Sequence, residues 1–124
     1  MRRQIFTALY ASGFLLIVAL GCGGSKTCTA ELDIDGVTWI GTDVEPERAK
    51  RNACSKYCIE GNLEFDLAHE RWLRTADAKK VPDREDKWAA QAKNKELGTI
   101  VERCVDNCQR SIKAEHYSPK VVCK

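Results

Sequence analysis

The side chains with the most evident chemistry in this 124-residue chain are its seven cysteines. Thiols can pair as disulfides, hold a metal ion as thiolates, or carry out thiol–disulfide exchange. Two C-x3-C motifs and three single cysteines are present. The motifs are Cys54 with Cys58 and Cys104 with Cys108, and the single residues are Cys22, Cys28 and Cys123. The spacing within the motifs decides which chemistry is open to them.

Disulfide formation is the chemistry that the C-x3-C spacing favours. Zinc ribbons usually bind the metal through C-x2-C knuckles on turns, and thioredoxin-type redox centres use C-x2-C at a helix start. The chain contains no C-x2-C, and therefore no C-x2-C-H site for covalent haem. We expect no metal ion and no cofactor, and keep a metal-binding or redox module built on the C-x3-C pairs as an alternative.

The two C-x3-C motifs fit a pair of antiparallel helices. Cysteines four residues apart lie one above the other on a helix face. Antiparallel packing would join Cys54 to Cys108 and Cys58 to Cys104, because both pairs are centred on residue 81. A proline follows this centre and is well placed to end one helix and open the next. The sequence therefore predicts a helical hairpin held by two disulfides.

The same register predicts an apolar stripe along the first helix. Its members are Cys54, Cys58, Gly61, Phe65, Ala68, Trp72 and Ala76. Across the hairpin, Phe65 would face Leu97 and Trp72 would face Ala90, so that small residues meet large ones. Gly61-Asn62 could instead end the first helix, because glycine is a common C-terminal cap, and a separate helix would then follow.

A β-hairpin is predicted ahead of the helices. Apolar and polar residues alternate over 28–34, and Asp35-Gly36 is a favoured two-residue turn. This turn pairs Leu32 with Trp39 in the returning strand. One face of the hairpin is then apolar and able to cover the helices.

The C-terminal segment completes the expected fold. Tyr117-Ser118-Pro119 ends the last helix, and residues 120–123 could form a third strand beside the hairpin. Cys28 and Cys123 remain by elimination and would join the two ends of the domain. We expect an α+β fold, with an N-terminal β-hairpin packed on a long antiparallel disulfide-stapled helical hairpin.

No motif groups catalytic side chains. The two histidines, His69 and His116, are expected to have solvated structural roles, and no motif places a serine or cysteine nucleophile with either. Asp83, Glu85 and Asp86 could form a calcium site, but acidic residues that open a helix are ordinary partners of its dipole. A glycine-rich phosphate loop is absent from the sequence. We therefore expect a non-enzymatic protein without catalytic residues.

Five aromatic side chains could line a groove for a glycan or a peptide. They are Trp39, Trp72, Trp88, Tyr57 and Tyr117. Packing in the core is the interpretation that we favour, because aromatic side chains bury large apolar surfaces. Trp88 lies off the predicted stripe and has no evident partner.

The N-terminal segment has the features of an export signal. Arg2-Arg3 precede an apolar run over 5–20, which is shorter than the roughly 20 residues of a membrane-spanning helix. The run ends in Val18-Ala19-Leu20-Gly21-Cys22, which resembles a bacterial lipobox. The resemblance implies that residues 1–21 are removed as a signal peptide and that Cys22 carries the lipid.

Lipidation implies a membrane anchor and a division of the chain. Several acyl chains on one cysteine hold a protein stably on a bilayer. Residues 22–27 would be a lipidated tether and residues 28–124 a single disulfide-stapled domain. Gly23, in place of an acidic residue, indicates the outer membrane, facing the periplasm or the cell surface. The expected location is the bacterial cell envelope, where disulfides form.

The charge balance argues against a nucleic-acid partner. Residues 1–21 hold two arginines and no acidic residue, so the mature chain has 18 basic and 18 acidic side chains. Nucleic-acid binding needs a basic excess that displaces phosphate counterions. We expect the partners to be a membrane, through the lipid, and a protein or a cell-wall component.

The mature domain, with its twin C-x3-C helical hairpin, resembles small lipoproteins of the myxobacterial type. This resemblance implies an envelope protein and carries no activity with it. Our leading hypothesis is a lipoprotein that presents a rigid domain to a protein or cell-wall partner. An inhibitor of a periplasmic enzyme, or a toxin-immunity protein, is the second hypothesis, and the metal or redox module is the third.

Overall fold

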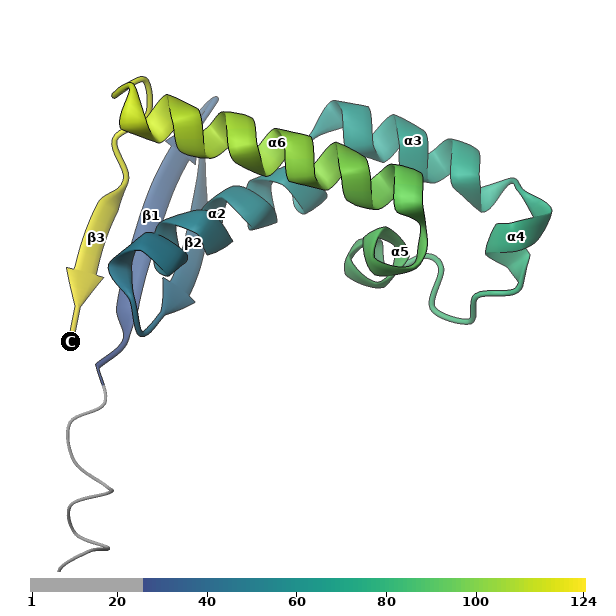
Figure 1. Ribbon diagram of the computed structural model, residues 1–124, viewed down its shortest axis with the longest axis horizontal. Coiled ribbons are helices and arrows are strands. Elements are labelled where there is room, and N and C mark those ends of the chain that lie inside the picture. The colour runs from purple at the N-terminus through teal and green to yellow at the C-terminus, as the bar shows by residue number, and fades with distance from the viewer. Residues whose placement is uncertain (1–25) are drawn as a thin grey trace, which may run out of the picture.

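The computed structural model describes residues 26–124, in which a three-stranded antiparallel sheet lies against a group of helices (Figure 1). The expectations for the signal peptide and for the lipid on Cys22 lie outside these residues. The elements are β1 (Cys28–Ile34), β2 (Val37–Asp43), α2 (Pro46–Glu60), α3 (Leu63–Leu73), α4 (Ala76–Lys79), α5 (Lys87–Lys93), α6 (Lys95–Lys113) and β3 (Lys120–Cys123). The predicted α+β fold is confirmed.

The sheet has the strand order β2-β1-β3. Leu32 lies opposite Trp39 across the two-residue turn, as the alternating pattern predicts. The possible third strand is present, and it runs antiparallel to β1 on the side away from β2. Thr27 and Lys124 extend this pairing, because each donates its backbone N–H to the other's carbonyl oxygen, at 2.9 and 3.0 Å. Thr27, expected in the tether, is therefore held beside β3.

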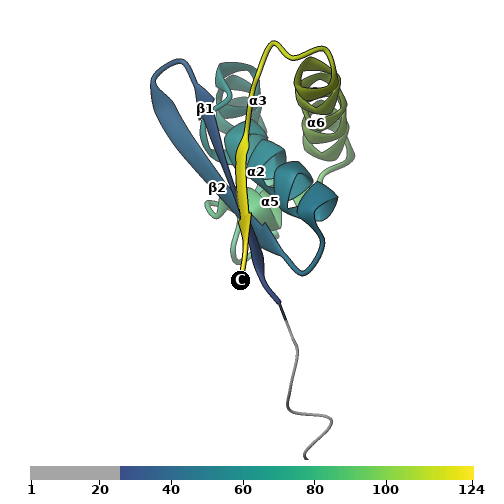
Figure 2. The ribbon, with the colours of Figure 1, turned by 90° about the vertical axis from the view of Figure 1, so that its left-hand side faces the viewer.

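One face of the sheet is covered by helix α2, and the helices form a second layer behind it (Figure 2). Gly41 of β2 allows this close packing. A Cβ atom at this position would lie 2.2 Å from both the carbonyl oxygen of Ala49 and the backbone nitrogen of Ala53. The alternate residues of β1, from Cys28 to Ile34, are almost completely buried under the same helix.

The first helical arm is divided at Gly61-Asn62, which settles the alternative left open by the sequence. The Gly61 N–H donates to the Tyr57 carbonyl at 2.8 Å and ends α2. The Asn62 side chain then accepts the Phe65 N–H at 3.0 Å and opens α3 as an N-cap. The ring of Trp39 occupies the space of a Gly61 Cβ, with Cζ2 2.3 Å from that position. A larger residue at 61 would displace the tryptophan.

The second arm is also divided, which the stripe did not predict. Asn94 ends α5, and its side chain accepts the Leu97 N–H at 3.0 Å to open α6. Helix α5 packs against α6 and α2 below the line of α6 (Figure 1). Trp72 and Ala90 are both buried in the same core, but Ala90 lies on the separate helix α5 and not, as the register predicted, on a continuation of α6. Phe65 and Leu97 are buried in the same core, as the register predicts.

Three disulfides join these elements. Cys54 is bonded to Cys108 and Cys58 to Cys104, with Cα–Cα distances of 5.9 and 5.8 Å between α2 and α6. A third bond joins Cys28 of β1 to Cys123 of β3. The helical register predicted the first two pairs, and elimination predicted the third. Because disulfides persist in oxidising compartments, the domain belongs to a secreted or envelope environment.

Candidate functional site

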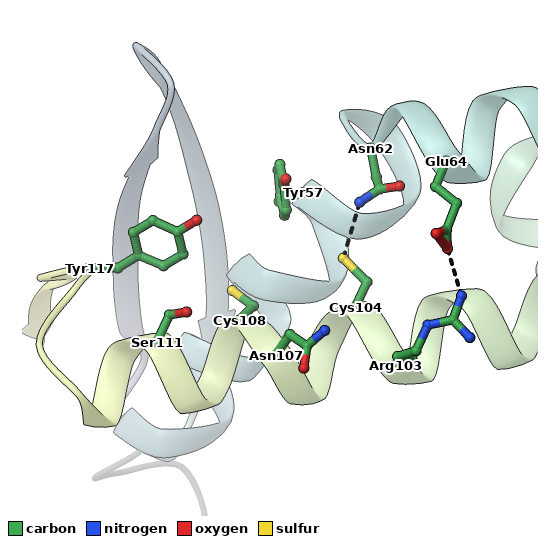
Figure 3. Close-up of a pocket in the computed structure, with 9 residues that line it drawn as sticks. All are labelled: Tyr57, Asn62, Glu64, Arg103, Cys104, Asn107, Cys108, Ser111 and Tyr117. Atoms are coloured by element: carbon green, nitrogen blue, oxygen red, sulfur yellow. Dashed lines mark hydrogen bonds and ion pairs between the residues drawn. The ribbon is translucent and has the colours of Figure 1, made fainter.

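A cleft of about 220 Å³ lies between α6 and the junction of α2 and α3 (Figure 3). Three parts of the chain line it: the end of α2 with the start of α3, one face of α6, and the segment that follows α6. The lining residues are Tyr57, Asn62, Glu64, Arg103, Cys104, Asn107, Cys108, Ser111 and Tyr117. This is the cavity in which aromatic and hydrogen-bonding side chains converge.

The floor of the cleft is formed by sulfur atoms of α6. Cys104 and Cys108 lie one helical turn apart, and each is bonded to a cysteine of α2 that is fully buried. The Asn62 side-chain amide donates to Cys104 Sγ at 3.5 Å. The floor is therefore fixed covalently and cannot widen by a sliding of the two helices.

Two tyrosines form the aromatic part of the lining. Tyr57 comes from α2, and its ring meets the ring of Trp39 in an edge-to-face contact, with centroids 5.9 Å apart. Tyr117 lies in the segment after α6, and both tyrosines border the cleft in Figure 3. Burial raises the pKa of the Tyr117 hydroxyl, and the nearby Tyr57 and Asp35 raise this pKa further. The phenol therefore stays protonated well into the alkaline range and can donate a hydrogen bond.

The return of the chain after α6 places Tyr117 at the cleft. The backbone carbonyl of Ser111 accepts the N–H groups of His116 and Tyr117, at 2.9 and 3.3 Å. Glu115 adopts a left-handed conformation with φ 64°, which reverses the chain at the helix end. The aromatic ring is thereby brought back beside the last turns of α6.

Polar side chains complete the lining along α6. Asn107 and Ser111 stand four residues apart and therefore share one helix face. Among the residues drawn in Figure 3, no hydrogen bond reaches either side chain. At the far end, Arg103 donates to Glu64 at 2.6 Å, and both side chains are more than half exposed. Within residues 26–124, the side chains of Asn107 and Ser111 are free to bond with a ligand, and an ion pair lies at the rim of the cleft.

The five aromatic residues considered in the sequence separate into three groups. Trp39 and Trp72 pack in or against the core, as expected. Tyr57 and Tyr117 also touch the core, but both remain partly exposed and line the cleft. Trp88 is 43% exposed and donates its indole N–H to the Glu60 carboxylate at 2.8 Å, which is the partner that the sequence did not reveal.

The histidines take different roles. His69 was expected to be solvated, and this was wrong: it is only 5% exposed, and its ring stacks between Phe65 and Trp72. Its Nε2 lies 2.8 Å from the carbonyl oxygen of Arg84, which can only accept, so Nε2 carries the proton. His69 therefore fixes the loop before α5 to the core. His116 is exposed, as expected for a solvated residue.

Six of the seven candidate metal ligands, all except Glu85, have other partners in this fold. The four C-x3-C sulfurs are bonded in pairs, so they do not act as thiolate ligands here. Asp86 caps α5 by accepting the N–H groups of Trp88 and Ala89, and Asp83 pairs with Lys93 at 3.3 Å. Within residues 26–124, no group of three or more His, Cys, Asp or Glu side chains is arranged to hold a metal ion.

Comparisons with known proteins add no relative. No protein-family model matches the chain, no curated protein matches it, and no solved structure matches it. Over residues 26–124, no helix has the length and apolar character needed to span a bilayer.

Proposed function

We propose that this protein is a non-enzymatic lipoprotein of the bacterial envelope, whose disulfide-held domain binds a cell-wall component in the cleft beside α6. Anchoring would occur through lipid on Cys22, after removal of residues 1–21. An outer-membrane position is part of the proposal, because Gly23 follows the lipidated cysteine. The observation that carries the binding function is the cleft itself, with two tyrosines and free polar groups over a disulfide floor.

The rigidity of the cleft supports binding of a ligand without reaction. Preorganised sites lose less conformational entropy when a ligand binds. Two disulfides fix α6 against α2, and Asn62 is held by hydrogen bonds to Phe65 and Cys104. A cleft that is already fixed in this way can bind a ligand without first paying for a conformational change.

The side chains around the cleft also favour binding over catalysis. A nucleophile needs a base within hydrogen-bonding distance. Ser111 is the serine that lines the cleft, but its side chain makes no hydrogen bond to another residue drawn in Figure 3. The Nε2–H of His69 already donates a hydrogen bond to the Arg84 carbonyl oxygen. The lining therefore offers recognition groups and no activated nucleophile.

A protein partner is the second candidate function. Leu63 and Leu67 lie one turn apart on α3 and are 71% and 50% exposed. Exposed apolar pairs of this kind suit a protein interface, such as that of a hydrolase inhibitor or an immunity protein. Capture of a single hydrolase by the anchored protein, without retention on cell walls, would favour this alternative.

Two measurements test the proposed function. Cells that express the full chain are labelled with palmitate, and isolated cell walls are then mixed with the detergent-extracted protein. We expect label on the wild type and on Ser25→Ala, no label on Cys22→Ser, and sedimentation of the protein with the walls. Label that survives Cys22→Ser would refute the anchor, and protein that stays in the supernatant would refute wall binding.

A further inference from the structure

The charge of the cleft limits what it can hold. Glu64 and Arg103 are the charged side chains among its nine lining residues, and they neutralise each other at the rim. An anionic or cationic ligand would have to break this pair in order to gain a counter-charge. The lining therefore suits an uncharged ligand that is rich in hydrogen-bonding groups.

The tyrosines indicate what the apolar part of the ligand must be. Each ring offers an apolar face, and each hydroxyl can donate and accept. Because the rings come from separate elements, they border the cleft from different sides (Figure 3). A flat ring with C–H groups on its faces and hydroxyls at its edge fits such a lining, as in a hexopyranose.

The polar side chains of α6 indicate which substituents the ring of the ligand carries. Asn107 offers a carbonyl acceptor and two amide protons, and Ser111 offers a hydroxyl. Side chains four residues apart on a helix have Cβ atoms separated by roughly 5–6 Å. They can therefore contact two substituents of one ring, such as an acetamido group and a neighbouring hydroxyl.

The size of the cleft limits the ligand further. Its volume of about 220 Å³ lies below the roughly 300 Å³ at which sites for drug-sized molecules begin. The cleft is therefore too small for a whole drug-sized molecule, and we expect it to take one sugar ring while the rest of a chain runs outside. A site of this kind grips one residue of a polymer rather than enclosing a whole ligand.

We infer that the cleft binds one uncharged N-acetylated sugar residue of a glycan, with the ring against Tyr57 and Tyr117 and its polar groups on Asn107 and Ser111. This inference rests on the proposed function, since it names the ligand of the same site. A neutral peptide is the other occupant that such a lining could take, and the test distinguishes the two.

The test is calorimetric titration of the protein as purified from the expressing cells in detergent micelles. The probes are the N-acetylglucosamine trisaccharide, the glucose trisaccharide without acetamido groups, and an uncharged hexapeptide. We expect the acetylated sugar to bind more tightly than the other two probes. Equal binding of both sugars, binding of the peptide alone, or no heat from the acetylated sugar at millimolar concentration would each overturn the inference.

Matched variants tie the binding to the cleft. Asn107→Ala removes an exposed amide, so we expect it to fold and to weaken binding of the acetylated sugar about three- to tenfold. Gln109→Ala removes an amide from α6 outside the cleft, where it pairs with Arg51, and should leave binding unchanged. Equal affinity in Asn107→Ala and wild type, or equal losses in both variants, would overturn the assignment.

The micelle experiment does not depend on where the protein resides in the cell. If the sugar binds but palmitate labelling fails, the ligand assignment stands and the proposed anchor falls. If the anchor is labelled and walls retain the protein but the sugar does not bind, the wall component must be of another chemical class. The two failures are therefore distinguishable.

Discussion

Replacement of Gly41 by alanine tests the packing of α2 on the sheet. The added Cβ would lie 2.2 Å from two backbone atoms, the carbonyl oxygen of Ala49 and the nitrogen of Ala53. Ordinary contact begins at 3.4 Å, so the helix must retreat by about 1 Å. Neither neighbour can rotate away, because both belong to the backbone of α2.

The expected cost follows from this geometry. Overpacking of a core usually costs about 1–3 kcal/mol. Here α2 is bonded to α6 by two disulfides, so it cannot shift alone. We therefore expect Gly41→Ala to lower the free energy of unfolding by about 3 kcal/mol, at the upper end of that range.

The assay is urea unfolding of the oxidised protein, followed by far-ultraviolet circular dichroism. Gly98→Ala is the matched control, because its Cβ would lie 3.1 Å from a single atom, the Gln91 carbonyl oxygen. The preference of a helix for alanine over glycine, about 1 kcal/mol, offsets the strain of this one contact. We expect the control to stay within about 0.5 kcal/mol of wild type. A loss below about 1 kcal/mol in Gly41→Ala would show that the close approach of α2 is not a constraint.

Three further predictions address the cleft and the core. The difference in tyrosinate absorbance between wild type and Tyr117→Phe should titrate above pH 10.0, because burial raises the pKa of Tyr117. The contribution of the protonated Tyr117 to the free energy of unfolding is then complete below pH 10.0, and it is lost as the pH rises through the raised pKa. A titration at or below 10.0 contradicts the burial. Phe65→Ala empties a fully buried site, and urea unfolding should show a loss of about 3–5 kcal/mol, with a loss under about 2 kcal/mol arguing against tight packing. Removal of one bridge by Cys58→Ala with Cys104→Ala should cost about 2–4 kcal/mol in the same assay, and an unchanged midpoint would mean that the bridge adds nothing to Cys54–Cys108.

The sequence allowed the sheet and the disulfide register to be predicted because their signals are local or arithmetical. Alternation and a two-residue turn determine the pairing of β1 with β2. Two C-x3-C motifs admit one antiparallel register with both bridges formed. The division at Asn94 had a local signal too, since asparagine is a favoured N-cap. This signal was missed because the apolar stripe continues past Asn94 and suggested one unbroken helix.

The cleft was less accessible to sequence reasoning, because tertiary contacts assemble it. Tyr117 reaches the cleft through a left-handed Glu115, a conformation with no signal in a non-glycine residue. His69 is buried between Phe65 and Trp72, and its Nε2–H donates a hydrogen bond to the carbonyl oxygen of Arg84, a long-range partner that no periodicity reveals. Asn107 and Ser111 did offer a signal, a polar pair at helical spacing. Their importance follows only from the two tyrosines beside them.

The bond between Cys28 and Cys123 determines how the domain bears tension. It lies one residue inside the pair formed by Thr27 and Lys124, where β1 and β3 run side by side. Pulling on Thr27 would load this covalent link first and pass the load along β3 into α6, while the hairpin and α2 stay unstretched. A molecule gripped beside α6 would therefore be held against a pull by covalent bonds rather than by hydrogen bonds between strands.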